Sequence, residues 1–213
     1  MKFWMSVQLF SLGIGSLLPV AITAQPMPRT PPVLRVSVFD DAGVGTATLR
    51  RAEREASRVF QRADIDVIWL RCPQEQISLG RCTGASYPAH LQLLVVSRPR
   101  AAKTSTVGIS FLSADGKGCQ ADVFYEPIVA LQMKTHTPTA IILGHAMAHE
   151  LGHLLLGTNS HSRDGLMRAQ WNRGDLAEAA KGNLLFSAEE STRMRSRFTR
   201  DDSDQLADLV QEK

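Results

Sequence analysis

The stretch AMAHELGHLLLGTNSHSRDGLM, residues 146–167, decides how this chain folds and what it can bind. Most of the stretch is apolar, yet it contains His149, Glu150, His153 and His161, and His145 lies just upstream. Four of the six histidines of the chain fall between positions 145 and 161. Such clustering of scarce titratable residues within an apolar segment indicates a metal site.

The apolar part of this stretch predicts a long buried helix from Pro138 to about Leu156. Thr137 is expected to cap its start with Pro138 in the first helical position, and Gly157 is expected to end it in a left-handed conformation. The segment is not expected to span a membrane, because three histidines and a glutamate would lie near mid-span, where each is costly.

The spacing within the helix predicts zinc chemistry. His149 and His153 are four residues apart, so they lie on one face of a helix and can bind one ion. Glu150 is rotated off that face, beside the metal but outside its ligand set. This is the pattern HExxH, in which zinc lowers the pKa of a water molecule and the glutamate accepts its proton as general base.

His145 shares the helical face of His149, but a straight helix cannot bring three side chains that span about 12 Å onto one ion. We therefore expect His145 in the outer sphere or at the surface.

The sequence here resembles the metzincin clan of zinc peptidases, which share HExxHxxGxxH and a methionine turn downstream. It is similar to the matrix metalloproteinase branch in having HELGH at residues 149–153, then Gly157, His161-Ser162 and Met167. It also resembles small exported bacterial zinc metalloproteases. The resemblance is strong over residues 138–170 and loose upstream. It implies His161 as the third zinc ligand and Met167 as an apolar floor beneath the metal, with Trp171 packed nearby.

The loop departs from the family pattern by two extra residues. Gly157 follows His153 by four positions, and His161 follows Gly157 by four, where the family has three and three. Three other ligands therefore stay open. Asp164 lies in the same loop, and a glutamate from the next helix would make the site resemble the gluzincins instead. The candidates on that helix are Glu189 and Glu190.

The rest of the chain predicts a single α+β domain. It is expected to be metzincin-like, with a small mixed sheet, a backing helix, the long active-site helix and a C-terminal helix. Alternating or continuous apolar runs predict strands, and 3.6-residue periodicity predicts the backing helix. Ser187 and Glu190 have the spacing of a capping box at the start of the C-terminal helix. The strands are expected at residues 33–39, 65–70, 90–97, 107–112 and 121–125, and the helices at 46–63 and from 187 to about 198.

The N-terminal sequence predicts export. Lys2 followed by an apolar run and small residues up to Ala24 is typical of a signal peptide, residues 1–24. Residues 25–32 form a proline-rich leader, residues 33–200 the zinc peptidase-like domain, and residues 201–213 a polar tail or short helix. We expect a secreted or periplasmic protein without stable membrane insertion after signal cleavage. The net charge of +3 is too small to indicate a nucleic-acid partner.

Export makes the three cysteines informative. Cys72 and Cys82 flank a nine-residue polar loop, and in an oxidising compartment we expect a disulfide between them. Cys119 would then be free and buried, although pairing with either of the others stays open.

Two functions from different classes fit this sequence. The first is an exported zinc endopeptidase with Zn²⁺ on His149, His153 and His161, and Glu150 as general base. Its peptide or protein substrate is expected to add as a strand along residues 121–125, taken as an edge strand. The alternative is a non-catalytic zinc-binding structural or interaction domain, which the altered loop spacing favours. Glu150 favours the enzyme, because a binding domain has no use for a base at that position.

Overall fold

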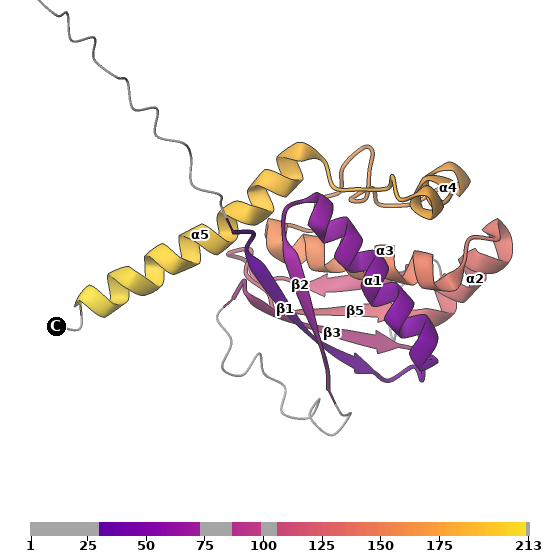
Figure 1. Ribbon diagram of the computed structural model, residues 1–213, viewed down its shortest axis with the longest axis horizontal. Coiled ribbons are helices and arrows are strands. Elements are labelled where there is room, and N and C mark those ends of the chain that lie inside the picture. Colours follow the sequence, from indigo (N-terminus) through magenta and orange to yellow (C-terminus); the bar gives the residue numbers. More distant parts are fainter. Residues whose placement is uncertain (1–29, 73–86, 99–105, 212–213) are drawn as a thin grey trace, which may run out of the picture. The chain divides into compact units, whose positions relative to one another are not determined.

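Five strands form one mixed sheet in the order β2-β1-β3-β5-β4 (Figure 1). The first four strands in this order run parallel, and β4 pairs antiparallel with β5 at one edge. This computed structural model describes residues 30–72, 87–98 and 106–211, and side chains up to residue 199. The strands are β1 (Val33–Asp40), β2 (Asp66–Arg71), β3 (His90–Val96), β4 (Gly108–Phe111) and β5 (Gln120–Phe124).

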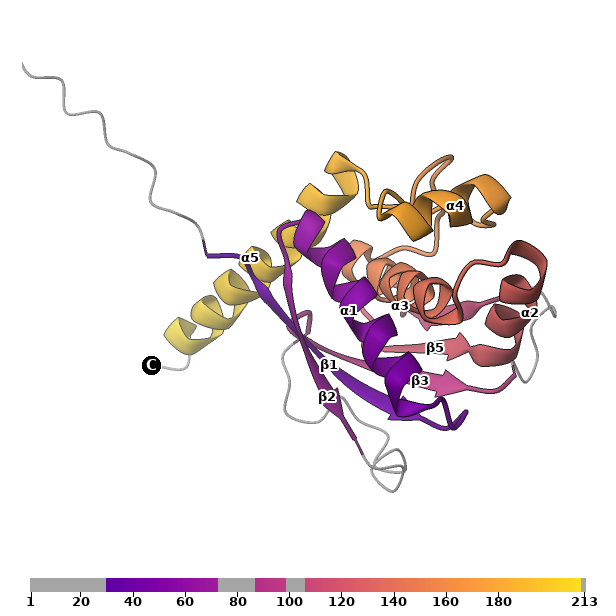
Figure 2. The same cartoon turned by 45° about the vertical axis from the view of Figure 1, so that its right-hand side comes forward.

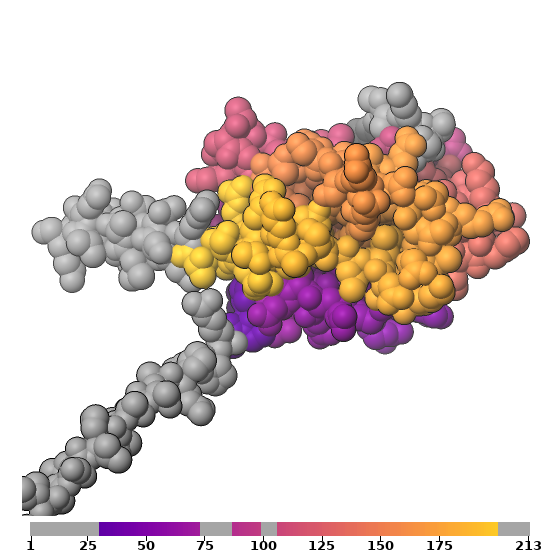
Figure 3. Space-filling view, turned by 90° about the horizontal axis from the view of Figure 1, so that it is seen from above, coloured from indigo at the N-terminus to yellow at the C-terminus, as the bar shows by residue number. Residues whose placement is uncertain are grey.

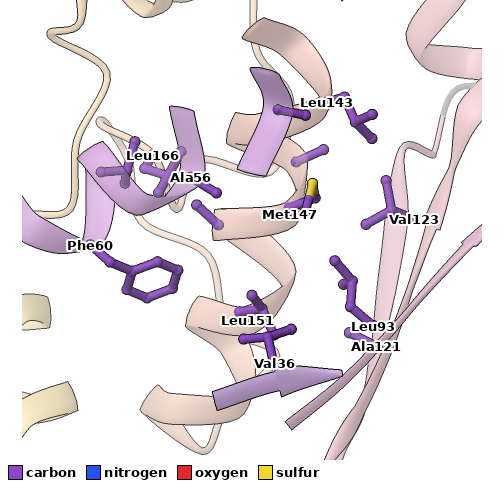
Figure 4. Close-up of a cluster of buried hydrophobic side chains, with 14 of the residues drawn as sticks. Val36, Ala56, Phe60, Leu93, Ala121, Val123, Leu143, Met147, Leu151 and Leu166 are labelled. Atoms are coloured by element: carbon purple, nitrogen blue, oxygen red, sulfur yellow. The ribbon is translucent and has the colours of Figure 1, made fainter. Parts of the chain in front are cut away.

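Two helices pack side by side on one face of the sheet (Figure 2). These are α1 (Thr46–Arg62) and α3 (Thr139–Leu156). Alternate residues of the parallel strands point into this layer because side chains of a strand alternate between its two faces. Helix α1 contributes one apolar stripe, whereas α3 is buried on nearly all sides, which explains why its sequence is apolar all round. Figure 4 shows the resulting core, where Val36, Leu93, Ala121 and Val123 of the sheet face Leu143, Met147 and Leu151 of α3.

Helix α3 begins one residue later than predicted. Pro138, not Thr137, is its N-cap, with an extended ψ of 133° and no side-chain capping hydrogen bond. The amide groups of Ile141 and Ile142 donate to the Pro138 carbonyl, so the proline ring stands just outside the helix. The predicted end is confirmed, because Gly157 has φ 68° and ψ 33°. Among the described residues, no helix has both the length and the hydropathy needed to cross a membrane.

Three further helices complete the fold. They are α2 (Tyr125–Thr135), α4 (Arg173–Lys181) and α5 (Ala188–Gln211). The capping box predicted at the start of α5 is confirmed, since Ser187 and Glu190 exchange both hydrogen bonds. The backbone of residues 201–211 continues α5. The sequence did not predict α2 or α4, although Asn172 and Asp175 form a second capping box at α4. Both helices are short, and their apolar periodicity is weak.

The predicted edge strand at residues 121–125 is wrong. Strand β5 lies between β3 and β4, and Tyr125 already belongs to α2. The edge on this side of the sheet is β4, because the chain reverses after Phe111 and its antiparallel hairpin places β4 outside β5. Pairing order of this kind depends on contacts distant in sequence, which local patterns do not encode.

The predicted Cys72–Cys82 disulfide is also wrong. Cys72 has a free thiol, and its Sγ lies 3.6 Å from the carbonyl oxygen of Leu70 at the end of β2. Cys119, between β4 and β5, is the disulfide-bonded cysteine, and its partner lies outside the described residues. The prediction chose the nearest cysteine in sequence, but a disulfide requires close Cα atoms, which the fold decides. The predicted signal peptide, residues 25–29 of the leader and Cys82 also lie outside the described residues.

Candidate metal centre and catalytic base

Helix α3 carries two imidazoles in a fixed orientation. His149 Nδ1 lies 2.8 Å from the Leu166 carbonyl oxygen, and His153 Nδ1 lies 2.8 Å from the Thr158 carbonyl oxygen. A carbonyl oxygen only accepts hydrogen bonds, so each Nδ1 must carry the proton and donate it. Each Nε2 therefore has a free lone pair. Hydrogen bonds of this kind fix both tautomer and ring orientation in metal-binding histidines.

The two Nε2 atoms face each other at 3.1 Å. Burial and the charge of His153 lower the pKa of His149 to about 3, and burial lowers the pKa of His153, with the charge of Glu190 opposing the shift. Near neutral pH both rings are therefore uncharged, and two lone pairs meet without a proton between them. Two nitrogens bound to one tetrahedral zinc ion stand about 3.3 Å apart. The pair thus has the chemistry and spacing of a metal site.

The loop after α3 brings His161 to this pair. The ring centroids of His161 lie 5.4 Å from His149 and 4.8 Å from His153. The potential ligand atoms of the three histidines all lie within 4.8 Å of one another, and His161 is the exposed member. The group fits Zn²⁺, for which three imidazoles and one open position form a catalytic site.

The other proposed ligands lie outside this group. Within the described part of the chain, the three histidines form the one cluster of three or more metal-binding side chains, and it includes neither Asp164 nor Glu189. Both oxygens of Glu190 are engaged elsewhere, by the Ser162 hydroxyl and the Ser187 amide.

Met167 and Trp171 pack against the part of α3 that carries the two histidines. Met167 is 1% exposed, and its Sδ lies against Gly152, which stands between the two helical histidines in the sequence. The Trp171 ring meets His149 edge-on at 5.6 Å. Its Nε1 donates to the Leu166 carbonyl at 3.1 Å, the same oxygen that accepts from His149. These side chains give the imidazoles an apolar surrounding on the core side.

The Glu150 side chain contacts the edge strand β4. It is 4% exposed, and the Ser110 hydroxyl lies 2.7 Å from its Oε2 and 2.8 Å from its backbone carbonyl oxygen. A Cβ atom at Gly108 would fall 2.5 Å from Glu150 Cγ and Oε1, so any other residue there would have to displace the Glu150 side chain. Burial raises the pKa of Glu150 to about 7, the Ser110 hydrogen bond opposes this, and the charge of Asp122 adds to it. A carboxyl group with a pKa near 7 is suited to take up and release a proton at neutral pH.

His145 lies in the core, so the prediction of a surface position is wrong. It is fully buried, its Nδ1 lies 2.8 Å from the Ile141 carbonyl oxygen, and it is not part of the histidine group. Burial lowers its pKa, and the nearby charge of Arg58 on α1 acts in the same direction. His145 is therefore a core residue outside the histidine group.

Several contributors to the site were not predicted. Gly108 and Ser110 come from β4, and the carbonyl oxygens of Thr158 and Leu166 orient the two helical histidines. Backbone carbonyls have no sequence signal. Ser162 did have a sequence signal, because the resemblance to the matrix metalloproteinases includes His161-Ser162. Its contact with Glu190 had none, because the two residues are distant in sequence.

Comparison with known proteins identifies the fold. No family model matches the chain, and no curated protein sequence matches it. Archaemetzincin from Methanopyrus kandleri is similar in structure, with a TM-score of 0.50 and 15% sequence identity, covering 81% of this chain and 99% of that one. A zinc-dependent peptidase from Methanocorpusculum labreanum (strain Z) gives a TM-score of 0.49 and 16% identity, covering 75% and 99%. The likeness to archaemetzincin confirms the metzincin-like fold expected from the sequence. At these identities the likeness concerns the fold, so the chemistry is argued from the site itself.

Proposed function

We propose that this chain is an exported zinc-dependent endopeptidase. The observation that carries the proposal is the convergence of three imidazoles beside a buried glutamate on a metzincin-like fold. His149, His153 and His161 would hold the ion, leaving one position open for water or substrate. Bound zinc would supply a Lewis acid that lowers the pKa of water and polarises the peptide carbonyl.

The residues of the chain supply the proton transfers. Glu150 accepts the proton of the attacking water and passes it to the departing amine, so that one carboxyl group serves both halves of hydrolysis. Ser110 holds this carboxylate against β4. Met167 and Trp171 keep the core side of the site apolar, which strengthens electrostatic interactions within it.

The substrate is proposed to bind along β4 as an additional antiparallel or parallel strand. β4 is the sheet edge that contacts Glu150, and among the described residues no strand pairs with its outer side, where a substrate strand could add. Ile109 and Phe111 stand on this edge with 42% and 47% of their surface exposed. They would contact apolar side chains at alternate positions of the substrate. Replacing a substrate residue that pairs with β4 by proline should abolish cleavage, and unchanged cleavage would contradict this binding mode.

Export is proposed from residues 1–24 and from the disulfide of Cys119, since disulfides persist in oxidising compartments. The intact mass of the protein recovered outside the cytoplasm should match a chain that begins at Gln25. A protein that retains residues 1–24 would contradict signal cleavage at this point.

The test of the function is zinc content and peptide cleavage in the wild type and in Glu150→Gln. The wild type should hold one zinc, cleave internal bonds of a broad peptide library, and lose activity with a chelator. Glu150→Gln should hold zinc and lose about 10²–10⁴-fold in turnover. A wild type that holds zinc and cleaves nothing would favour the second candidate, a non-catalytic zinc-binding domain, which the longer loop before His161 supports.

A further inference from the structure

We propose that Glu190 and Ser162 form a latch that holds the third zinc ligand, so that both are positioning residues for His161. The inference rests on the proposed metal site and goes beyond it. The feature that calls for explanation is the loop between α3 and His161, which is two residues longer than the metzincin pattern. A longer loop can adopt more conformations. A metal ligand on it therefore needs an additional contact to hold it in place, which a ligand on the shorter loop does not need.

The loop is anchored firmly at its start. The Thr158 carbonyl accepts from His153 Nδ1, and the Thr158 amide donates to the His153 carbonyl at 3.3 Å. The amide of Ser160 donates back to the Thr158 hydroxyl at 3.1 Å. After Thr158 only Asn159, Ser160 and His161 remain before the next fixed residue, so the position of His161 depends on what fixes Ser162.

Ser162 is held through its backbone, which also forms a β-bridge with Arg168, and through its side chain. Its amide donates to the Met167 carbonyl at 2.9 Å, which ties its backbone to the turn below the site. Its hydroxyl donates to Oε1 of Glu190, at the start of α5. In Figure 3 the orange surface that includes this loop adjoins the yellow surface of α5. The latch therefore joins the ligand loop to a helix that lies beyond α4 in the sequence.

Glu190 is suited to this second task because it is already immobilised. It is 6% exposed, and its Oε2 accepts from the Ser187 amide at 2.8 Å while its own amide donates to the Ser187 hydroxyl at 3.2 Å. A capping box uses one oxygen of the glutamate for the helix terminus. Here the other oxygen is committed to Ser162, so a rigid, buried carboxylate holds the residue adjacent to His161.

The capping box offers a control that separates helix stability from ligand positioning. Ser162→Ala removes the latch and leaves the cap intact. Ser187→Ala removes the cap hydroxyl, but the Ser187 amide still holds Glu190, so the latch remains. Ser162→Thr restores a hydroxyl and serves as the rescue variant. None of these changes touches a proposed zinc ligand.

The experiment measures the rate at which zinc passes from each full-length protein to an excess of a chromophoric chelator, together with the melting temperature. Ser162→Ala should release zinc about tenfold faster, the lower end of the effect of outer-sphere changes at metal sites. Ser162→Thr should return the rate toward that of the wild type. Ser187→Ala should melt earlier and release zinc at the rate of the wild type.

Two outcomes would overturn the latch, and they differ from failure of the proposed function. Zinc release from Ser162→Ala at the rate of the wild type would show that His161 is held without it. Equal acceleration in Ser187→Ala and Ser162→Ala would show that general loosening of α5, rather than the latch, sets the rate. A wild type that binds no zinc would instead remove the proposed function, and the latch with it.

Discussion

The metal centre has two halves that are built differently. His149 and His153 lie on a helix buried on nearly all sides, and each ring is fixed by a backbone carbonyl. His161 lies on a surface loop, is exposed, and is positioned through its neighbour Ser162. The helical half is part of the hydrophobic core, so it exists wherever the fold exists. The loop half adds little to the core, so its order should depend on the metal and on the latch.

Removing the loop ligand should have the largest effect on metal binding and almost none on folding. We expect His161→Ala to weaken zinc binding by more than the roughly 10–100-fold that outer-sphere changes cost. The free energy of unfolding of the zinc-free protein should change by no more than about 0.5 kcal/mol, because the side chain is exposed. Calorimetric zinc titration and urea unfolding measure the two quantities.

The matched change in the helical half is His153→Ala. It should cost about 1–3 kcal/mol in the zinc-free protein, because a buried side chain is removed and the partly buried Thr158 carbonyl loses its donor. Equal effects of the two substitutions on zinc-free stability would remove the contrast between the halves.

The proposed catalytic base, Glu150, should be as sensitive to its surroundings as the proposed helical ligands. Gly108→Ala would place a Cβ atom 2.5 Å from the Glu150 side chain and displace it. We expect kcat to fall about 100-fold with zinc affinity unchanged, since misplacement of a catalytic group by about 1 Å costs roughly this much. The neighbouring substitution Ile109→Ala serves as the control, because it should alter KM and not kcat. A Gly108→Ala enzyme with the kcat of the wild type would show that β4 does not position the base.

Amide hydrogen exchange should show the contrast directly. Zinc should slow exchange in the loop, at residues 159–163, by about tenfold or more, and leave the amides of α3 nearly unchanged, because the helix is already protected by burial. Mass spectrometry of the protein with and without zinc measures both segments in one experiment. Equal protection of loop and helix on zinc binding would mean that the whole site orders together.

The smallest predicted effect concerns His145, which lies buried on α3. Burial lowers the pKa of His145, so the unfolded chain binds this proton more readily than the folded one. His145 should therefore lower the stability of the folded protein as pH falls. The loss begins near the pKa of His145 in the unfolded chain, about 6.5, and continues down to its lower pKa in the folded protein. The slope is at most about 1.4 kcal/mol per pH unit.

His145→Leu should remove the part of the pH dependence of the unfolding free energy that His145 contributes. Urea unfolding of the zinc-free protein at pH 7.5 and at lower pH measures it, with the wild type as reference. A variant with the same acid sensitivity as the wild type would show that His145 does not contribute.

Prediction from sequence succeeded where the information is local. Helix α3, its end at Gly157 and the pairing of His149 with His153 follow from periodicity and four-residue spacing. The capping box of Ser187 and Glu190 is a local pattern as well.

Prediction failed where distant segments meet. The edge position belongs to β4 rather than β5 because a hairpin folds outward, and Cys72 is free because the fold decides which cysteines approach. His145 looked like a surface or outer-sphere residue because its helical face is shared with His149, yet it is buried in the core. Short helices such as α4 were missed because nine residues carry little periodicity.

We propose that three imidazoles, two from the helix and one from the loop, hold one zinc ion. X-ray absorption at the zinc edge, on the zinc-loaded full-length protein, counts imidazole ligands directly. We expect three in the wild type and in Glu150→Gln, at about 2.0–2.1 Å, and two in His161→Ala. Two imidazoles and a carboxylate in the wild type, with His161→Ala unchanged, would contradict the account and return Asp164 or Glu189 as the third ligand.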